Sequence, residues 1–303
     1  MPPLEITIWD VNHGSAAYIK TPNNRHIVVD LGDRGDAFSP LSHLYYRGVR
    51  QLDAVVITHP HADHIDDIFR FDALKPAVLW RPKHLTEADI KRGNRLSDMP
   101  LIEAYLEIDQ RFNALVPPTN DITVPASFGG ASFQVFSPHR CETSNLNNHS
   151  LVVIVSYAGS KMVIPGDNEA PSWTELLENP GFVSAVRGAD ILLASHHGRD
   201  AGYCGELFEA MGKPMLVVVS DGRFGYTSAT SRYSNQATGW AVFDGANSKE
   251  TRNCLTTRCD GDITINFGWN NDGASQTPYL NVRTSKVNTN AILRRILGGK
   301  PEF

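Results

Sequence analysis

The chain has 303 residues, of which 41% are hydrophobic and 20% charged, a balance typical of a folded globule rather than a disordered chain. It carries 28 lysines and arginines against 33 aspartates and glutamates, so the net charge is −5. This charge argues against a protein that holds nucleic acid through bulk positive charge, and leaves a locally basic groove open.

The chain shows no membrane or secretion signal. No stretch approaches the roughly 20 apolar residues that cross a bilayer, and the first residues lack the basic and apolar regions of a secretory signal. The four cysteines, Cys141, Cys204, Cys254 and Cys259, are too few and too scattered for a disulfide framework. We therefore expect reduced thiols in a cytoplasmic protein without a membrane partner.

The first part of the chain predicts strands that lead into a buried run. Period-2 apolar patterns and β-branched residues indicate strands over 4–10, 15–21, 25–31 and 53–58, with a short helix over 41–49. A helical pattern follows residue 64. The stretch 81–125 is polar, and we expect a partly helical insertion over one end of the core.

The second part of the chain repeats strands followed by helices. Strands are predicted over 132–136, 150–157, 161–165, 190–195, 215–220 and 262–267, and helices over 172–178 and 206–211. Residues 231–257 are expected to form a long connection rich in serine, asparagine and glycine. A short helix over 292–297 and a tail lie within 290–303. The two similar halves predict two sheets packed face to face with helices outside, in one domain over 1–303.

The strongest chemical signal is the segment His59-Pro60-His61-Ala62-Asp63-His64, directly after the buried strand at 53–58. Side chains alternate along an extended segment, so His59 and His61 point the same way, and Asp63 and His64 follow in the turn. Four potential ligands within six residues suit a pair of metal ions, and imidazole with carboxylate suits zinc, manganese or iron. The alternative is a polar loop whose histidines cap the next helix.

Three more ligand-type groups stand beside predicted strands. Asp167 follows the strand at 161–165, where a carboxylate could bridge two ions. His196 and His197 follow the strand at 190–195, and His149 precedes the strand at 150–157. A lone histidine of this kind is more often structural than a ligand. Open α/β sheets place their sites at strand ends, so the recurrence favours one metal centre.

These motifs resemble those of the metallo-β-lactamase superfamily, and in particular the hydrolase domain of the competence DNA-uptake protein ComEC and its stand-alone relatives. The resemblance covers most of the chain, with matching segments in the same order at 9–15, 28–32, 148–152, 166–167, 196–198 and 257–264. The chain departs from the group at His13, where the group has glutamine, and at 224–228, which lacks the group's histidine. These departures leave the substrate open.

The resemblance implies a four-layer αββα sandwich with two divalent ions, zinc or manganese, at the sheet edges. One ion would be held by imidazoles, those of His59, His61 and His149. The other would be held by Asp63, His64 and either His196 or His197, with Asp167 between the two ions. His149 could instead contact a ligand or the substrate, and His139 is its rival. Asp10, His13 and Asp30 would orient ligand imidazoles through their second nitrogen, with turn capping as the alternative for the two aspartates.

The implied chemistry is hydrolysis. Paired ions bring the pKa of a shared water to about 7, and Asp63 with His64 would be the catalytic residues that orient the hydroxide. The first hypothesis is a phosphodiesterase acting on DNA, RNA or a nucleotide. The second is a hydrolase of a lactone, thioester or β-lactam. The third is a metal-binding scaffold without turnover in a DNA-uptake or antiviral system.

Basic residues beside the motif favour a nucleic acid or nucleotide partner, although such a run is usually a solvated face. They are Arg70, Arg81, Lys83, Lys91, Arg92 and Arg95, of which Arg81 and Lys83 are the candidate substrate contacts. Tyr226, like Trp80 and Trp240, could stack a base, with core packing as the alternative. The sequence sets no oligomeric state.

Overall fold

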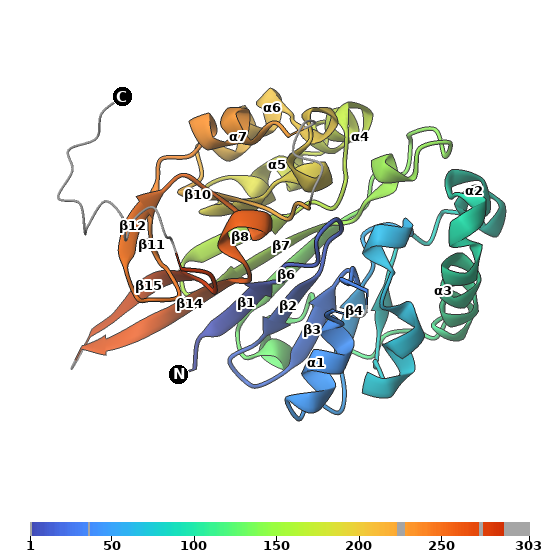
Figure 1. Ribbon diagram of the computed structural model, residues 1–303, viewed down its shortest axis with the longest axis horizontal. Coiled ribbons are helices and arrows are strands. Elements are labelled where there is room, and N and C mark those ends of the chain that lie inside the picture. Colours follow the sequence, from blue (N-terminus) through green and yellow to red (C-terminus); the bar gives the residue numbers. More distant parts are fainter. Residues whose placement is uncertain (1, 36, 223–227, 273–274, 288–303) are drawn as a thin grey trace.

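Two β-sheets face each other in this computed structural model, which describes residues 2–35, 37–222, 228–272 and 275–287 (Figure 1). Within these residues, nine strands form one sheet in the order β12-β11-β15-β14-β1-β2-β3-β4-β5. Six strands form the other, in the order β13-β10-β9-β8-β7-β6. The helices lie on the outer sides of the two sheets, as Figure 1 shows.

The larger sheet begins as an antiparallel meander and continues with parallel strands. Strand β2 pairs antiparallel with β1 and β3, and β3, β4 and β5 run parallel. Its strands are β1 (Leu4–Ile8), β2 (Ala17–Lys20), β3 (His26–Val29), β4 (Ala54–Val56), β5 (Leu79–Trp80), β11 (Trp240–Phe243), β12 (Lys249–Arg252), β14 (Ile263–Asp272) and β15 (Ser275–Thr284). The parallel strands β3 and β4 end at the same edge, which brings Asp30 beside the turn that follows β4.

The smaller sheet is parallel over β8, β9, β10 and β13, and antiparallel over β6, β7 and β8. Its strands are β6 (Ser132–Phe136), β7 (Val152–Tyr157), β8 (Ser160–Ile164), β9 (Ile191–Leu193), β10 (Leu216–Val219) and β13 (Cys254–Thr256). Because β8 and β9 are parallel neighbours, Asp167 and His197 follow strand ends on the same edge of this sheet.

Helices cover the outer faces of both sheets. The larger sheet carries α1 (Pro40–Tyr46), α2 (Glu87–Gly93) and α3 (Met99–Arg111), and the smaller carries α4 (Ala170–Leu177), α5 (Pro180–Val186), α6 (Gly205–Met211) and α7 (Thr230–Gln236). A short α8 (Thr257–Asp260) follows β13. The 3₁₀ segments are η1 (Ala62–His64), η2 (Ile68–Leu74), η3 (Leu96–Asp98), η4 (Pro125–Phe128), η5 (Leu146–His149), η6 (Ser195–Gly198) and η7 (Asp200–Gly202).

Three apolar clusters fill the spaces between these layers. One lies between the sheets and joins residues of both, such as Ile6 and Ile164. A second lies beneath α1, α2 and α3 and includes Leu44. The third lies beneath α4 to α7, with Trp173 fully buried. The order of helices, sheet, sheet and helices confirms the predicted αββα sandwich.

The predicted strands of both halves are present, with ends shifted by up to two residues except in the late strand. The expectation of a long connection over 231–257 is wrong, because this stretch contains most of α7 and all of β11, β12 and β13. The late strand predicted to end at residue 267 continues to Asp272 and forms a hairpin with β15. The insertion contains α2 and α3, and the predicted helix over 292–297 lies outside the described residues.

Two absences expected from the sequence concern membranes and disulfides. Among the described residues, no helix combines the length and the apolar character that spanning a bilayer requires. All four cysteines lie in the described part of the chain, and each has a free thiol.

Candidate metal centre

The turn after β4 is fixed by a buried aspartate on the neighbouring strand. Asp30 follows β3, is fully buried, and accepts hydrogen bonds from the Thr58 amide at 2.7 Å and the Thr58 hydroxyl at 2.9 Å. The next turn, η1, brings the chain back beside the end of β3, where the Leu31 amide donates a hydrogen bond to the His64 carbonyl at 2.8 Å. His59 and His64 are consequently both fully buried.

The smaller sheet contributes its side chains from two neighbouring turns. Gly166 has a φ of +59°, and a Cβ there would lie 2.8 Å from the Cβ atoms of both Ser150 and Thr58. Only glycine allows this close approach between the two sheets without strain. After β9, His196 and His197 have φ angles of 48° and 53°. Residues other than glycine rarely adopt this left-handed backbone conformation, and such backbone strain concentrates at functional sites.

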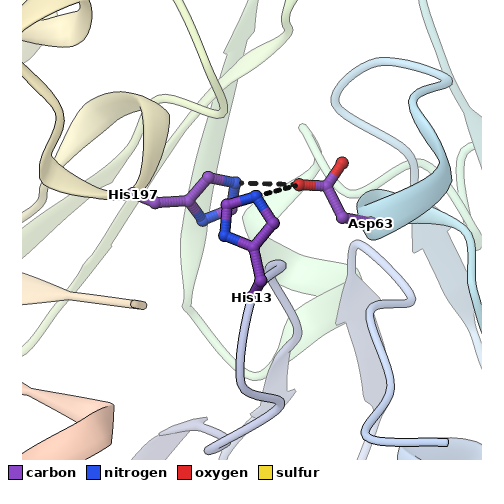
Figure 2. Close-up of side chains that lie close together, drawn as sticks. All are labelled: His13, Asp63 and His197. Atoms are coloured by element: carbon purple, nitrogen blue, oxygen red, sulfur yellow. Dashed lines mark ion pairs between the residues drawn. The ribbon is translucent and has the colours of Figure 1, made fainter. Parts of the chain in front are cut away.

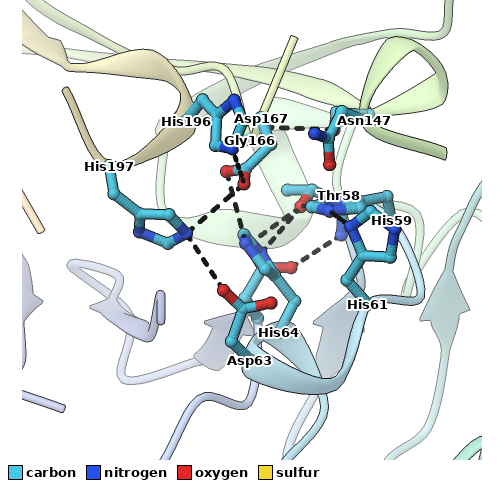
Figure 3. Close-up of polar contacts among 12 residues, drawn as sticks. Thr58, His59, His61, Asp63, His64, Asn147, Gly166, Asp167, His196 and His197 are labelled. Carbon is cyan, nitrogen blue, oxygen red and sulfur yellow. Dashed lines mark hydrogen bonds and ion pairs between the residues drawn. The ribbon is translucent and has the colours of Figure 1, made fainter. Parts of the chain in front are cut away.

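Four side chains from these turns converge, as Figure 3 shows. Nε2 of His197 lies 3.3 Å from both Asp63 Oδ2 and Asp167 Oδ2. Nε2 of His64 lies 3.3 Å from Asp167 Oδ1. The turn after β4 and the turns after β8 and β9 thus meet at one point between the sheet edges.

Two more imidazoles lie beside this point. Nε2 of His59 is 2.9 Å from Nδ1 of His61, and the ring centroids of His59 and His64 are 4.2 Å apart. Ligand-type atoms of His59, His64 and Asp167 lie within 4.8 Å of one another. A second group within the same limit joins His13, Asp63 and His197, drawn in Figure 2.

Strong charge coupling marks the cluster. Burial alone would lower the pKa of His197, but the carboxylates of Asp167 and Asp63 raise it to about 10. Asp167 and Asp30 likewise raise the pKa of His64 well above its usual value, against the effect of burial. The same imidazoles hold the pKa values of Asp63 and Asp167 below the usual range, although burial opposes this.

The orientation of the imidazoles fits a metal ion. Nδ1 of His64 contacts Asp30 Oδ2 at 2.8 Å, and Nδ1 of His197 contacts the Ser220 carbonyl at 3.0 Å. The Nε2 atoms of both rings are buried and have no hydrogen-bond partner among the described residues. Metal-binding histidines use one nitrogen for the ion and the other for such an acceptor. The donor set therefore fits a divalent cation.

His149 and its rival His139 lie apart from this cluster. Nδ1 of His149 is 2.8 Å from Nε2 of His84, and its Nε2 is 3.3 Å from the Glu142 carbonyl. His139 is exposed and its Nδ1 lies 3.2 Å from the Ser137 carbonyl. The structure thus does not bring His149 together with His59 and His61, because both ring nitrogens of His149 face other partners.

Of the adjacent pair after β9, His197 enters the cluster and His196 stands at its side. Nδ1 of His196 contacts Glu169 Oε1 at 3.0 Å, and its Nε2 is 3.9 Å from Asp167 Oδ2. Glu169 was not among the predicted residues, although it follows Asp167 by only two positions.

The three residues expected to orient ligand imidazoles differ in their contacts. Asp30 contacts the His64 ring, as described above. Asp10 does not take this place, because its carboxylate lies 3.4 Å from Nη1 of Arg34 and 3.1 Å from Nζ of Lys286. His13 lies directly against the cluster, with its Nε2 3.3 Å from Asp63 Oδ2 (Figure 2).

The structure does not favour Arg81 as a substrate contact, and it gives several of the nearby cations acidic partners. Arg81 is buried, forms an ion pair with Asp109, and donates to the Phe112 carbonyl at 3.0 Å, so it holds α3 in place. Lys83 is exposed. Three further cations pair with acids on their own turns, at 3.0 Å or less: Arg70 with Asp67, Lys91 with Glu87, and Arg92 with Asp89. Tyr226 lies outside the described residues.

Two polar residues near the cluster were not predicted from the sequence. Arg199 directs Nη2 to Nε2 of His13 at 3.2 Å and Nη1 to Nε2 of His196 at 3.5 Å. Asn147, in η5, lies with its side chain beside the His61 ring (Figure 3). Arg199 directly follows the His196-His197-Gly198 segment, and this position beside two candidate ligands could have marked it as a site residue. For Asn147, the nearby His149 was the more obvious ligand.

Comparisons with known proteins agree with this geometry. A family model described as the metallo-beta-lactamase superfamily matches residues 9–198, more than half of the chain. ComE operon protein 3 of Bacillus subtilis is 23% identical over 72% of this chain and 28% of that protein. Competence protein ComA of Neisseria gonorrhoeae is 24% identical over 72% of this chain and 27% of that protein. The matches thus span little more than a quarter of these two relatives.

A solved structure adds a more distant likeness. The Zn²⁺-bound PqqB from Methylobacterium extorquens aligns with a TM-score of 0.40 and 12% identity, over 83% of this chain and 89% of that one.

Proposed function

Because this chain belongs to the metallo-beta-lactamase superfamily, we propose that it is a metal-dependent hydrolase of phosphodiester bonds in DNA, RNA or a nucleotide. The observation that carries the proposal is the meeting of two buried imidazole nitrogens, which form no hydrogen bond among the described residues, with two carboxylates 3.3 Å away at the sheet edges. Buried polar atoms without partners are costly, and a shared cation would satisfy all of them.

The ligands of the two ions come from separate turns. Asp63, His64 and His197 would hold one ion, and the imidazoles of His59 and His61 would hold the other. Asp167 would be shared by both ions, because its carboxylate lies 3.3 Å from Nε2 of His64 and of His197 and also belongs to one compact group of ligand-type atoms with His59. Imidazole with carboxylate suits zinc or manganese.

The protein's own side chains supply orientation. When bound, such paired ions would acidify a shared water and neutralise charge on the attacked group. Asp63 is partly exposed, with 26% of its side chain accessible, so a carboxylate oxygen can accept a hydrogen bond from the attacking water and orient it. Asp30 holds His64 through Nδ1 and keeps its Nε2 directed into the site.

Arg199 supports a phosphodiester substrate over a carbonyl one. In the described part of the chain its side-chain partners are the imidazoles of His13 and His196, both at the rim of the cluster. Its charge thus has no carboxylate counterpart among those residues. A guanidinium matches the geometry of a phosphate, and its donors can hold a non-bridging oxygen. The resemblance to competence proteins adds support for a nucleic acid.

A substrate panel tests the proposal. Protein loaded with Mn²⁺ or Zn²⁺ would be assayed on bis-p-nitrophenyl phosphate, single- and double-stranded DNA, RNA, a thioester, a lactone and a β-lactam. We expect phosphodiester cleavage that disappears in the double variant His59→Ala, His61→Ala. His139→Ala, which removes an exposed imidazole outside the cluster, serves as the matched control and should keep full activity. Cleavage that survives the double change, or turnover restricted to carbonyl substrates, would contradict the proposal.

A further inference from the structure

The side chain of Asn147 is fixed with its amide oxygen free. The residue is 8% exposed, and its Nδ2 donates to Glu169 Oε1 at 3.0 Å. A carboxylate only accepts hydrogen bonds, so the NH₂ end must face Glu169 and the oxygen must face away from it. That oxygen, Oδ1, is buried and has no hydrogen-bond partner among the described residues.

Glu169 is itself held in place, which makes this orientation rigid. Its carboxylate also accepts from Asn145 Nδ2 at 2.9 Å and lies 3.0 Å from Nδ1 of His196. These contacts use both carboxylate oxygens of Glu169. An amide whose NH₂ end is held by such a group has little freedom to flip.

The free oxygen lies on the side of the cluster that His59 and His61 occupy. The Asn147 side chain lies beside the His61 ring, as Figure 3 shows. The imidazoles of His59 and His61 offer Nε2 and Nδ1 only 2.9 Å apart, a spacing that one ion can bridge. With Asp167 they provide three ligands, and a further protein donor would complete four-coordination.

His149 does not provide that donor. Its ring nitrogens face His84 at 2.8 Å and the Glu142 carbonyl at 3.3 Å. Asn147 and His149 belong to the same 3₁₀ turn, η5, and the turn directs one of them towards the cluster and the other away from it.

We propose that Asn147 Oδ1 is a ligand of the ion held by His59 and His61, and that this amide oxygen shifts the preference of that position from zinc towards manganese. The inference rests on the paired metal centre proposed above. Carbonyl oxygens suit Mg²⁺, Ca²⁺ and Mn²⁺, whereas imidazole suits zinc. An amide oxygen in place of a third imidazole therefore weakens zinc more than manganese. The two positions of the centre become unequal, because the other ion keeps His64, His197 and Asp63.

Metal-binding measurements on four proteins test this ligand. Wild type, Asn147→Ala, Asn147→His and His149→Gln would be titrated with Mn²⁺ and Zn²⁺ against a competing chelator. Electron paramagnetic resonance of the Mn²⁺-loaded forms would report coupling between neighbouring ions. We expect wild type and His149→Gln to bind two ions with a coupled spectrum. Asn147→Ala should bind its weaker ion at least about tenfold less tightly and show an uncoupled spectrum.

The histidine variant separates a ligand from a structural role. Asn147→His should restore the second ion and raise the zinc-to-manganese affinity ratio at least about tenfold, a gain that mere packing would not produce. It also carries the test if Asn147→Ala fails to fold. Wild-type affinities in Asn147→Ala, or loss of one ion in His149→Gln, would overturn the assignment. Catalytic turnover is not read in these titrations, so a wrong substrate would leave their result unchanged.

Discussion

Replacing Asp30 with asparagine would show how the fold directs the His64 imidazole. Asp30 is fully buried and accepts three hydrogen bonds, from the Thr58 amide, the Thr58 hydroxyl and His64 Nδ1, at 2.7, 2.9 and 2.8 Å. Asparagine keeps one accepting oxygen and turns the other position into a donor. If the oxygen stays with the Thr58 amide, the NH₂ group faces His64 Nδ1.

The magnitude follows from that mismatch. Facing an NH₂ group, the ring takes the tautomer with its proton on Nε2, the nitrogen that must be free for an ion. Removing such a partner typically weakens metal binding about 10- to 100-fold, which is about 1.4 to 2.7 kcal/mol. A mispaired buried donor also costs about 1 to 3 kcal/mol of folding free energy.

The assay is a metal titration of Asp30→Asn beside a control of matched burial. Asp53 is buried directly before β4 of the same sheet, forms an ion pair with Arg25, and accepts a hydrogen bond from the His26 amide at 2.7 Å. Asp53→Asn should lower the urea midpoint and leave metal affinity unchanged. If Asp30→Asn bound metal as tightly as wild type, or both variants lost affinity equally, the orienting role of Asp30 would be wrong.

Three further results follow from the structure. Gly166→Ala should lower the free energy of unfolding by about 1 to 3 kcal/mol, since its Cβ would lie 2.8 Å from two others; an unchanged urea midpoint would show that the turn is looser than described. Arg199→Gln should raise KM for a phosphodiester about tenfold with the metal count unchanged, and an unaltered KM would remove this cation from substrate binding. Burial raises the pKa of the Cys254 thiol to about 12. Its alkylation at pH 8.5 should therefore be slower than that of exposed Cys259. The alkylation rate of Cys254 should rise about tenfold per pH unit up to pH 10. Mass spectrometry would measure both rates, and equal rates would contradict the burial argument.

The parts of the fold that the sequence predicts are those with strong local patterns. The apolar run at 53–58 and the ligand-rich segment beginning at His59 mark a buried strand and its turn without any long-range information. Strand β12 was missed because Lys249–Arg252 is a polar edge strand without apolar alternation. It pairs with β11, which in turn pairs with β15, and this tertiary pairing rather than the local pattern identifies it as a strand.

In the candidate site, too, local sequence patterns predict some residues, and tertiary contacts determine the others. Spacing brought out the residues that directly follow buried strands, such as Asp167 and His197. It could not separate Asn147 from His149, because side-chain direction within a 3₁₀ turn depends on partners such as Glu169 and His84. It also assigned Arg81 to substrate, since its partner Asp109 lies 28 residues away on α3.

The most direct test of the paired centre is an anomalous difference map from crystals of the Mn²⁺-loaded protein, recorded at the manganese edge. We expect two peaks about 3.5 to 4 Å apart on either side of the Asp167 carboxylate, one against His64 and His197 and the other against His59 and His61. A map without a peak within bonding distance of Asp167 would contradict the account.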